Sequence, residues 1–245
     1  MKDSLYTEMY KIEKYHWWFV GRRNIIYMFL VNFLPNKINN AIDIGCGTGL
    51  NTSLLKSFSN NVAALESSDV AINFVKKSNP ELSIIKGKFP DFYSNEKYDL
   101  ITLFDVLEHI KDDSYSLKRI EELLNPGGVA LITIPALPLL WTEHDELFGH
   151  YRRYKKGELE NLITSNTKLS ITKISYFNFF LFPPILLIRL IKKIYNFRKG
   201  ESDFYNSSKP INYLFSKIFS LEGFFIKYVN LPIGSSIICV LRKDE

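Results

Sequence analysis

The sequence predicts an α/β fold in which a doubly wound, mostly parallel seven-stranded sheet carries added helices. Three observations predict it. Short apolar runs alternate with helical patterns of 10–15 residues, a glycine-rich loop follows the first run, and an acidic residue ends the second. Strands separated by helices of this length are typical of βαβ units and therefore of parallel sheets.

The elements follow in a regular order. A helical segment over 5–34 precedes the sheet, a loop-rich insertion starts at Pro135 and ends near residue 155, and a helix covers 156–165. The apolar runs end at turn residues, as buried strands do. The expected strands are 40–45, 61–66, 82–86, 98–104, 128–134, 168–176 and 235–241.

The loop after the first strand has glycine at Gly45, Gly47 and Gly49 and opens a helix over 51–58. Glycine lets the backbone take positive φ and lets a ligand lie against it. A helix N-terminus adds unpaired N–H groups. The spacing is G-x-G-x-G, and the sixth position of a dinucleotide fingerprint is Leu50 instead of glycine. A tight turn without a ligand is the alternative.

The second strand ends at Glu66, at close to the spacing of about 20 residues at which an acidic side chain binds a ribose diol in such sheets. A carboxylate suits a diol because both of its oxygens accept hydrogen bonds. Alternatively, Glu66 is a surface residue before the helix cap at 67–69.

Two further segments complete a family pattern. Residues 98–110 run from a strand into a helical turn, and 124–135 form a turn followed by an apolar strand. Together with 43–49, they resemble the class I S-adenosylmethionine (SAM)-dependent methyltransferases, over about 38–136. The resemblance is greatest to the type 11/12 group, which includes ubiquinone-biosynthesis O-methyltransferases. It implies a Rossmann-like sheet whose final strand is antiparallel.

Two flanking motifs narrow the resemblance. His-Trp-Trp-Phe-x-x-Arg-Arg lies at 16–23, and a His-Asp-Glu-Leu-x-Gly-His-x-Arg-Arg-Tyr motif lies at 144–154. The pair is similar to prokaryotic methyltransferases linked to polysaccharide or lipid-glycan synthesis.

The resemblance implies SAM as cofactor and S-adenosylhomocysteine as product. It assigns the glycines to the approach of the backbone, Glu66 to the ribose, and Phe104 and Asp105 to the methionine side. Lys88 stands where the family commonly has an acceptor for the adenine amino group, so stacking or a backbone contact of Phe89 is expected instead. The implied cofactor-binding residues are Trp18, Arg23, Asp43, Gly45, Cys46, Gly47, Gly49, Glu66, Ser67, Lys88, Phe89, Phe104 and Asp105.

Arg22 and Arg23 are both candidates for the SAM carboxylate, because an arginine fork fits a carboxylate. Solvation of a helix face is the alternative. Trp17 and Trp18 are candidates for a cation–π contact with the sulfonium, or for plain core positions.

Proton removal from an acceptor calls for a base that titrates near neutral pH, and histidine does so. The candidates are His109, His144 and His150, and the choice between them stays open. Arg152, Arg153 and Tyr154 are expected to bind an anionic or polyhydroxylated acceptor, or else to solvate a helix entry. No metal site is expected.

Composition and charge argue against an exported, disulfide-bonded protein and against a nucleic-acid-binding protein. The two cysteines, Cys46 and Cys239, give no disulfide framework, and the first residues show no export signal, which predicts a cytoplasmic protein. Residues 1–150 hold 15 Lys and Arg against 19 Asp and Glu, whereas 151–245 hold 16 against 7. The basic residues are scattered among apolar ones, so nucleic acid is not the expected partner.

An apolar run over 177–188 is too short to span a bilayer, which takes about 20 residues. Two readings stay open: a helical cap or dimer surface, and an interfacial anchor at the inner face of an anionic membrane. The basic residues that follow the run are Arg189, Lys192, Lys193, Arg198 and Lys199.

The expected organisation is an N-terminal helical cap (1–37), a SAM-binding domain (38–176 and 230–245) and an inserted helical segment (177–229). The expected function is O-methylation of a small hydroxylated acceptor: a glycan, a lipid-linked intermediate or a quinone precursor. The alternatives are a nicotinamide-dependent dehydrogenase, a non-catalytic SAM-binding protein and a membrane-associated module.

Overall fold

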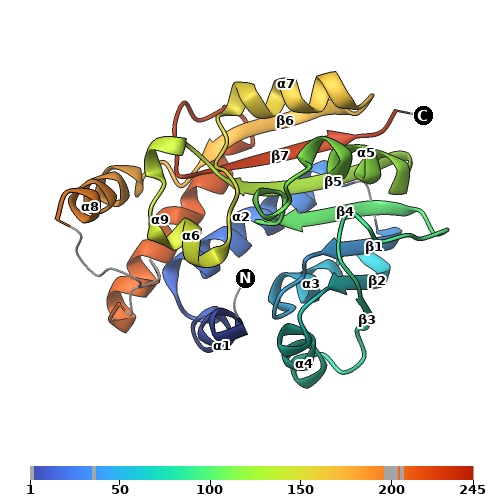
Figure 1. The fold of residues 1–245 in the computed structure, drawn as a ribbon, viewed down its shortest axis with the longest axis horizontal. Coiled ribbons are helices and arrows are strands. Elements are labelled where there is room, and N and C mark those ends of the chain that lie inside the picture. Colours follow the sequence, from blue (N-terminus) through green and yellow to red (C-terminus); the bar gives the residue numbers. More distant parts are fainter. Residues whose placement is uncertain (1–2, 35–36, 196–203, 205–206, 245) are drawn as a thin grey trace.

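The computed structural model describes residues 3–34, 37–195, 204 and 207–244, with the side chains of 193–195 left aside. One seven-stranded sheet runs through it, in the order β3-β2-β1-β4-β5-β7-β6 (Figure 1). The strands are β1 Ile38–Ile44, β2 Ser59–Glu66, β3 Ser83–Lys86, β4 Tyr98–Phe104, β5 Leu124–Pro135, β6 Ser170–Phe177 and β7 Ser236–Arg242.

The expected sheet is confirmed, including its direction. Strands β3 to β5 pair in parallel, and β7 lies antiparallel between β5 and β6. The order reverses at β1, from which the chain moves outward first to β2 and β3 and then to β4. Such a switch point leaves a crevice at the carboxyl ends of the strands, where ligands of doubly wound sheets bind.

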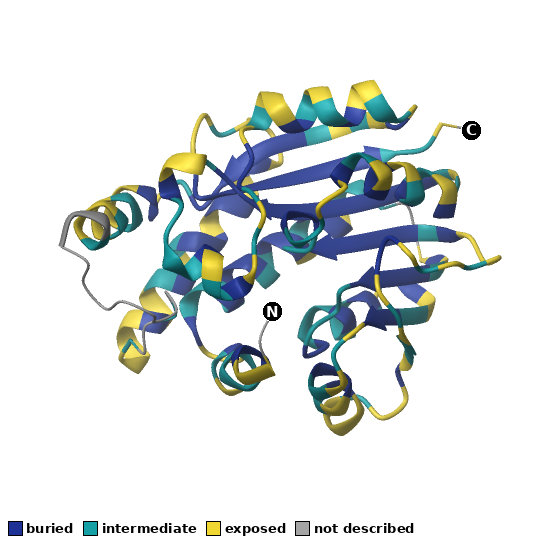
Figure 2. Cartoon of the chain, viewed as in Figure 1, coloured by how far each residue is buried: buried dark blue, intermediate teal, exposed yellow. Residues whose placement is uncertain are grey.

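Helices cover both faces of the sheet, so the central strands are mostly buried, whereas the edge strand β3 is not (Figure 2). Helices α5 and α7 pack on one face, and α2, α3 and α9 on the other. The helices are α1 Asp3–Ile12, α2 Trp17–Phe33, α3 Leu50–Leu55, α4 Asp69–Ser78, α5 Asp113–Leu123, α6 Glu143–Phe148, α7 Lys156–Asn166, α8 Phe182–Tyr195 and α9 Lys209–Ile226.

The N-terminal segment is two helices and not one. The break falls where His16 caps α2, its Nδ1 accepting the N–H of Trp18 at 3.3 Å. Tyr6 and Met9 of helix α1 lie at the crevice, whereas Ile25 and Phe29 of α2 enter the core. Residues 1–37 therefore hold one helix at the crevice and one built into the sheet's cover; the proposed domain division stays a prediction.

The segment between β6 and β7 folds into α8 and α9. Helix α9 lies against α2, and Phe219 fills the space left by Gly21, where an added Cβ would come within 2.4 Å of the ring. Among the described helices, none has both the length and the apolar content to cross a membrane. Arg198 and Lys199 lie outside the described residues.

Candidate functional site

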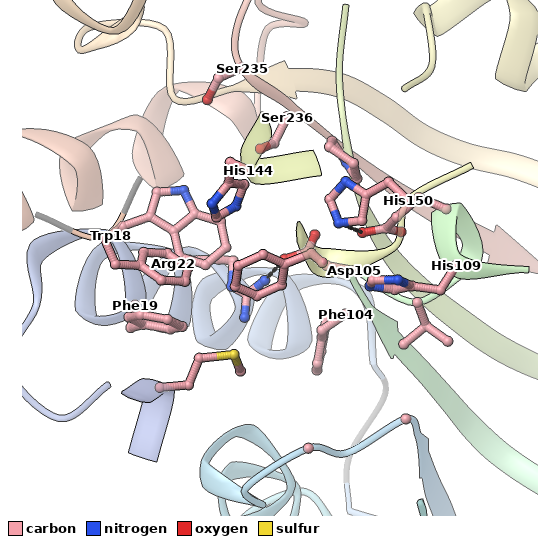
Figure 3. A pocket seen from close by; sticks show the side chains of 18 of the residues that line it. Trp18, Phe19, Arg22, Phe104, Asp105, His109, His144, His150, Ser235 and Ser236 are labelled. Carbon is pink, nitrogen blue, oxygen red and sulfur yellow. Dashed lines mark hydrogen bonds and ion pairs between the residues drawn. The ribbon is translucent and has the colours of Figure 1, made fainter. Parts of the chain in front are cut away.

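A cavity of about 640 Å³ opens at the carboxyl ends of the strands. Its walls come from α1 and α2, from the loops after β1, β2, β4 and β5, and from α6, α8 and α9. Figure 3 shows the side chains that point into it, with Arg22 and Asp105 central, His109 and His150 to one side, and Trp18 to the other. This is where the fold predicts a ligand.

The glycine loop forms one wall, and its three glycines take positive φ, as expected. At Gly45 a Cβ would approach Val106 within 2.6 Å, so no larger side chain fits there. At Gly47 a Cβ would meet nothing within 4 Å, because that backbone faces open space. The loop therefore exposes bare backbone to the cavity at Gly47, as close ligand contact requires.

Glu66 is held by backbone N–H groups at the end of β2. Its Oε2 accepts the N–H of Gly47 at 2.9 Å, and its Oε1 accepts those of Ser67 at 2.7 Å and Ser68 at 2.9 Å. The Tyr6 hydroxyl donates to Oε1 at 3.4 Å from α1. The carboxylate is buried yet lines the cavity, so it both fixes the loop and offers an anchored acceptor.

Asp43 lies behind the loop and is not among the residues that line the cavity. Thr52 and Thr102 donate hydrogen bonds to its two oxygens at 2.5 Å and 2.7 Å. Burial raises the pKa of Asp43 to about 6. The position suits a residue that orders the loop from below.

The next pair is Arg22 and Asp105. Arg22 of α2 forms an ion pair with Asp105 after β4 and lies over the Trp18 ring, 4.2 Å from its centroid. Burial lowers the pKa of Arg22 to about 10, so it remains a cation at neutral pH. Its Nε has no hydrogen-bond partner within the described residues. A buried arginine with a spare N–H donor can bind the carboxylate of a ligand by donating a hydrogen bond to it.

Arg23 differs from Arg22 in its surroundings. It is not among the cavity-lining residues, and its electrostatic partner is Glu13. Glu13 in turn accepts the Thr48 hydroxyl, which ties the turn before α2 to the glycine loop. Of the two arginines, the structure brings Arg22 to the cavity.

His150 is fixed by a buried carboxylate. Its Nδ1 lies 2.8 Å from Asp145 Oδ1, and the same oxygen accepts from Arg153 Nε at 2.7 Å. Burial would raise the pKa of Asp145, but the bond with His150 and the charges of Arg153 and Arg189 hold it well below its ordinary value. Asp145 is therefore an anion that accepts a hydrogen bond from Nδ1 of His150, and in the neutral ring this geometry makes Nε2 the accepting nitrogen.

Glu108 and His109 stand beside that imidazole. Glu108 is fully buried, and neither of its oxygens has a hydrogen-bond partner within the described residues. Burial raises the pKa of Glu108 to about 8, so it is mainly protonated at neutral pH. Burial and the neighbouring His150 lower the pKa of His109 to about 3, so this ring is neutral.

These three side chains converge on one small space. His150 Nε2 lies 4.0 Å from Glu108 Oε1, and the rings of His109 and His150 meet at 4.7 Å. One ligand atom from each lies within 4.8 Å of the others, so the cluster has the donor set to hold a divalent cation. It can equally receive a hydroxyl group and take its proton.

An aromatic wall faces the polar cluster. The Phe204 ring lies 4.8 Å from Phe19, 5.3 Å from His144 and 5.7 Å from Phe148. His144 stacks on Phe148 at 4.3 Å. His144 therefore belongs to the apolar side of the cavity.

Most of the candidate residues reach the cavity. Those that line it are Trp18, Gly45, Gly47, Glu66, Ser67, Lys88, Phe89, Phe104, Asp105, His109, His144, His150 and Arg153. Arg152 and Tyr154 do not: they bond to Asp113 of α5, at 2.5 Å and 2.9 Å. Cys46 and Gly49 lie within the loop, away from the lining.

Sequence reasoning gave no catalytic or binding role to Glu108, Asp145 or Phe204. For Asp145 a signal was present, because it lies inside the motif at 144–154. Phe204 lies among charged residues, and its place in the wall has no sequence signature.

Comparison with known proteins agrees with this geometry. A family model described as a methyltransferase domain matches residues 22–171. A probable S-adenosylmethionine-dependent methyltransferase of Mycolicibacterium smegmatis is 24% identical over 49% of this chain and 46% of its own. The ubiquinone biosynthesis O-methyltransferase of Rickettsia bellii is 23% identical over 52% and 61%. The chain thus spans about half of these relatives.

A solved structure extends the likeness to nearly the whole fold. The N-methyltransferase NodS from Bradyrhizobium japonicum, in complex with S-adenosylhomocysteine, superposes with a TM-score of 0.56 at 14% identity. The match covers 91% of this chain and 87% of NodS. At this identity the likeness is one of fold.

Proposed function

The chain belongs to the methyltransferase-domain family, whose members of this fold are class I SAM-dependent methyltransferases, and from this premise we propose that it O-methylates a small hydroxylated acceptor. The methyl donor is SAM and the product S-adenosylhomocysteine. Oxygen is proposed over nitrogen because a hydroxyl must lose its proton, and the cavity contains a histidine oriented for that purpose.

The residues present fit SAM. Gly47 offers backbone facing open space, Glu66 offers an anchored carboxylate for a ribose diol, and Arg22 offers a spare donor for a carboxylate. Lys88 and Phe89 line the side expected for adenine. When bound there, SAM supplies an electrophilic methyl group on a sulfonium.

The observation that carries the proposal is the Asp145–His150 pair. Asp145 keeps the Nδ1 proton in place, so His150 Nε2 takes the proton of the acceptor hydroxyl as its oxygen becomes the nucleophile. Neutral His109 and protonated Glu108 lie beside that nitrogen and orient the hydroxyl. Arg153 supports the pair by bonding Asp145 and the carbonyl of Ala136 at 3.0 Å.

An acceptor panel tests the choice of oxygen. Purified protein is incubated with SAM and either polyols and sugars, catechols and quinols, or primary and secondary amines, and S-adenosylhomocysteine release is measured. We expect release with a hydroxylated class and mass-spectrometric location of the methyl on oxygen. Turnover confined to amines would contradict O-methylation, and SAM binding without turnover on any class would favour a non-catalytic SAM-binding protein.

Metal removal tests how the proton leaves. Because His150 takes the proton directly, we expect EDTA dialysis to leave turnover unchanged. A loss that Mg²⁺ or Zn²⁺ restores would instead assign the deprotonation to a cation bound by Glu108, His109 and His150, since a bound cation also lowers the pKa of an oxygen ligand.

We also propose peripheral contact with an anionic membrane from the cytoplasmic side. What supports it is the apolar and basic character of the segment between β6 and β7. A homodimer through the same segment is the competing assembly.

A further inference from the structure

Helix α9 has apolar residues on both of its faces: Phe219 and Ile226 are buried in the core beside small and polar residues, and a second set of apolar residues is exposed. Its inner face presents Asn212, Ser216, Ser220 and Gly223 to α2. Asn24 donates to Ser220 Oγ at 2.9 Å, and Asn212 Oδ1 accepts the N–H of Trp17 at 3.0 Å. The outward face of a helix on a water-soluble domain is usually charged or polar, so an exposed apolar face in addition to the buried one is unusual.

The outward face is a continuous apolar stripe. Phe224 is 61% exposed, Phe225 50% and Leu221 51%. Their spacing of three and four residues puts the exposed side chains on one side of the helix. The α9 stripe is Ile211, Leu214, Leu221, Phe224, Phe225 and Tyr228. Apolar patches of this kind mark a surface that contacts a protein or a membrane.

Charge points to a bilayer as the occupant. The exposed lysines of this region are accompanied by tyrosines: Lys217 lies 5.3 Å from the ring of Tyr213, and Lys227 5.4 Å from that of Tyr228. The acidic residue of α9, Glu222, is fully buried, and the sequence of α8 has none. Lysine and tyrosine beside an apolar stripe are typical of helices that lie in the interface of an anionic membrane.

The apolar surface continues into the cavity. Phe180, before α8, contacts Phe225 at 5.9 Å between ring centroids. Ile188 of α8 is 45% exposed and also lines the cavity, and Phe215 of α9 lines it too. Helices α8 and α9 therefore contribute apolar residues both to the exposed surface and to the cavity wall.

We propose that α9 docks flat on an anionic bilayer through the α9 stripe, so that the cavity receives an acceptor held in the membrane by an apolar tail. The acceptor class rests on the proposed function, whereas the docking does not. This extends the interpretation of the apolar run at 177–188 as an interfacial anchor, because the α9 stripe lies farther along the chain and supplies its own apolar side chains.

Vesicle cosedimentation tests the docking. The full chain is mixed with vesicles of phosphatidylcholine alone or of equimolar phosphatidylcholine and phosphatidylglycerol. We expect binding to the anionic vesicles, weakened but not abolished by salt, because apolar insertion is not screened. The Phe224→Ser/Phe225→Ser variant should bind at least about tenfold more weakly, because it loses the free energy gained when each phenylalanine side chain leaves water.

The matched control is Tyr93→Ser, which removes a 75% exposed aromatic side chain far along the chain from α9 and should leave binding unchanged. Lys217→Glu/Lys227→Glu should reduce binding to anionic vesicles, whereas Lys76→Glu/Lys77→Glu on α4 should not. Each variant is also checked for thermal unfolding and S-adenosylhomocysteine affinity, which these exposed positions should not alter.

Two outcomes would overturn the proposal. In one, Phe224→Ser/Phe225→Ser binds vesicles as the wild type does. In the other, the wild type ignores both vesicles and light scattering shows a dimer that the same variant dissociates, which would make the α9 stripe a subunit interface. Neither outcome bears on methyl transfer, because turnover on a water-soluble acceptor measures the proposed function separately.

Discussion

Replacing His150 with asparagine is expected to lower turnover by about 10²- to 10⁴-fold, the usual contribution of a general base. Asp145 orients the imidazole, and its Nε2 lies near Glu108. In this proposal the other described side chains do not replace Nε2 as the proton acceptor. SAM binds against the glycine loop and Glu66 in this proposal, so its affinity should remain close to that of the wild type. Steady-state turnover and isothermal calorimetry measure the two quantities.

His144→Asn is the matched control, because it removes the same chemical group from a neighbouring position in the same cavity. His144 stacks on Phe148 and lies 6.4 Å from His150 between ring centroids. We expect it to alter acceptor KM more than kcat. If His144→Asn causes the large loss in kcat and His150→Asn does not, then His144 is the base and the Asp145–His150 pair has a structural role.

The sheet could be predicted because its signal is local. Parallel strands buried on both faces read as apolar runs, and most of β4 and the second half of β5 do so. The glycine loop could be predicted for a similar reason: positive φ at three alternate positions strongly favours glycine, whatever the rest of the fold does.

The acid–base cluster could not be assembled from the sequence, because its members come from different loops. Glu108 and His109 follow β4, whereas Asp145 and His150 lie around α6. Sequence spacing does not reveal that the buried side-chain oxygens of Glu108 have no hydrogen-bond partner within the described residues. For the same reason, Arg152 and Arg153 are equivalent in the sequence, yet one bonds Asp113 and the other Asp145.

Which face of α9 is buried also could not be predicted from the sequence. Its apolar residues repeat at helical spacing, which normally predicts the buried side. The close packing identifies the buried face: Phe219 fits against Gly21, and an added Cβ at Gly223 would come within 2.5 Å of Met28 Sδ.

Glu66→Ala is expected to weaken the binding of SAM and S-adenosylhomocysteine by about 1–3 kcal/mol, the range for a lost hydrogen bond to a charged group. That is roughly a 5- to 150-fold rise in Kd. The carboxylate lies at the cavity wall with three backbone N–H groups already on it, so it is held in place before any ligand arrives. A ribose diol then gains an acceptor without the cost of ordering it.

Alanine at this position also frees the Gly47 and Ser67 N–H groups, so loop disorder must be separated from the lost ribose contact. Glu66→Gln makes that separation, because its amide oxygen still accepts from one of the two sides while the charge is gone. We expect its affinity to lie between those of wild type and alanine, with a thermal midpoint nearer the wild type. Tyr6→Phe removes only the distant phenol donor, at 3.4 Å, and should change affinity little. Calorimetry showing equal Kd values for wild type, glutamine and alanine would remove Glu66 from the ribose site and leave it as a brace of the glycine loop.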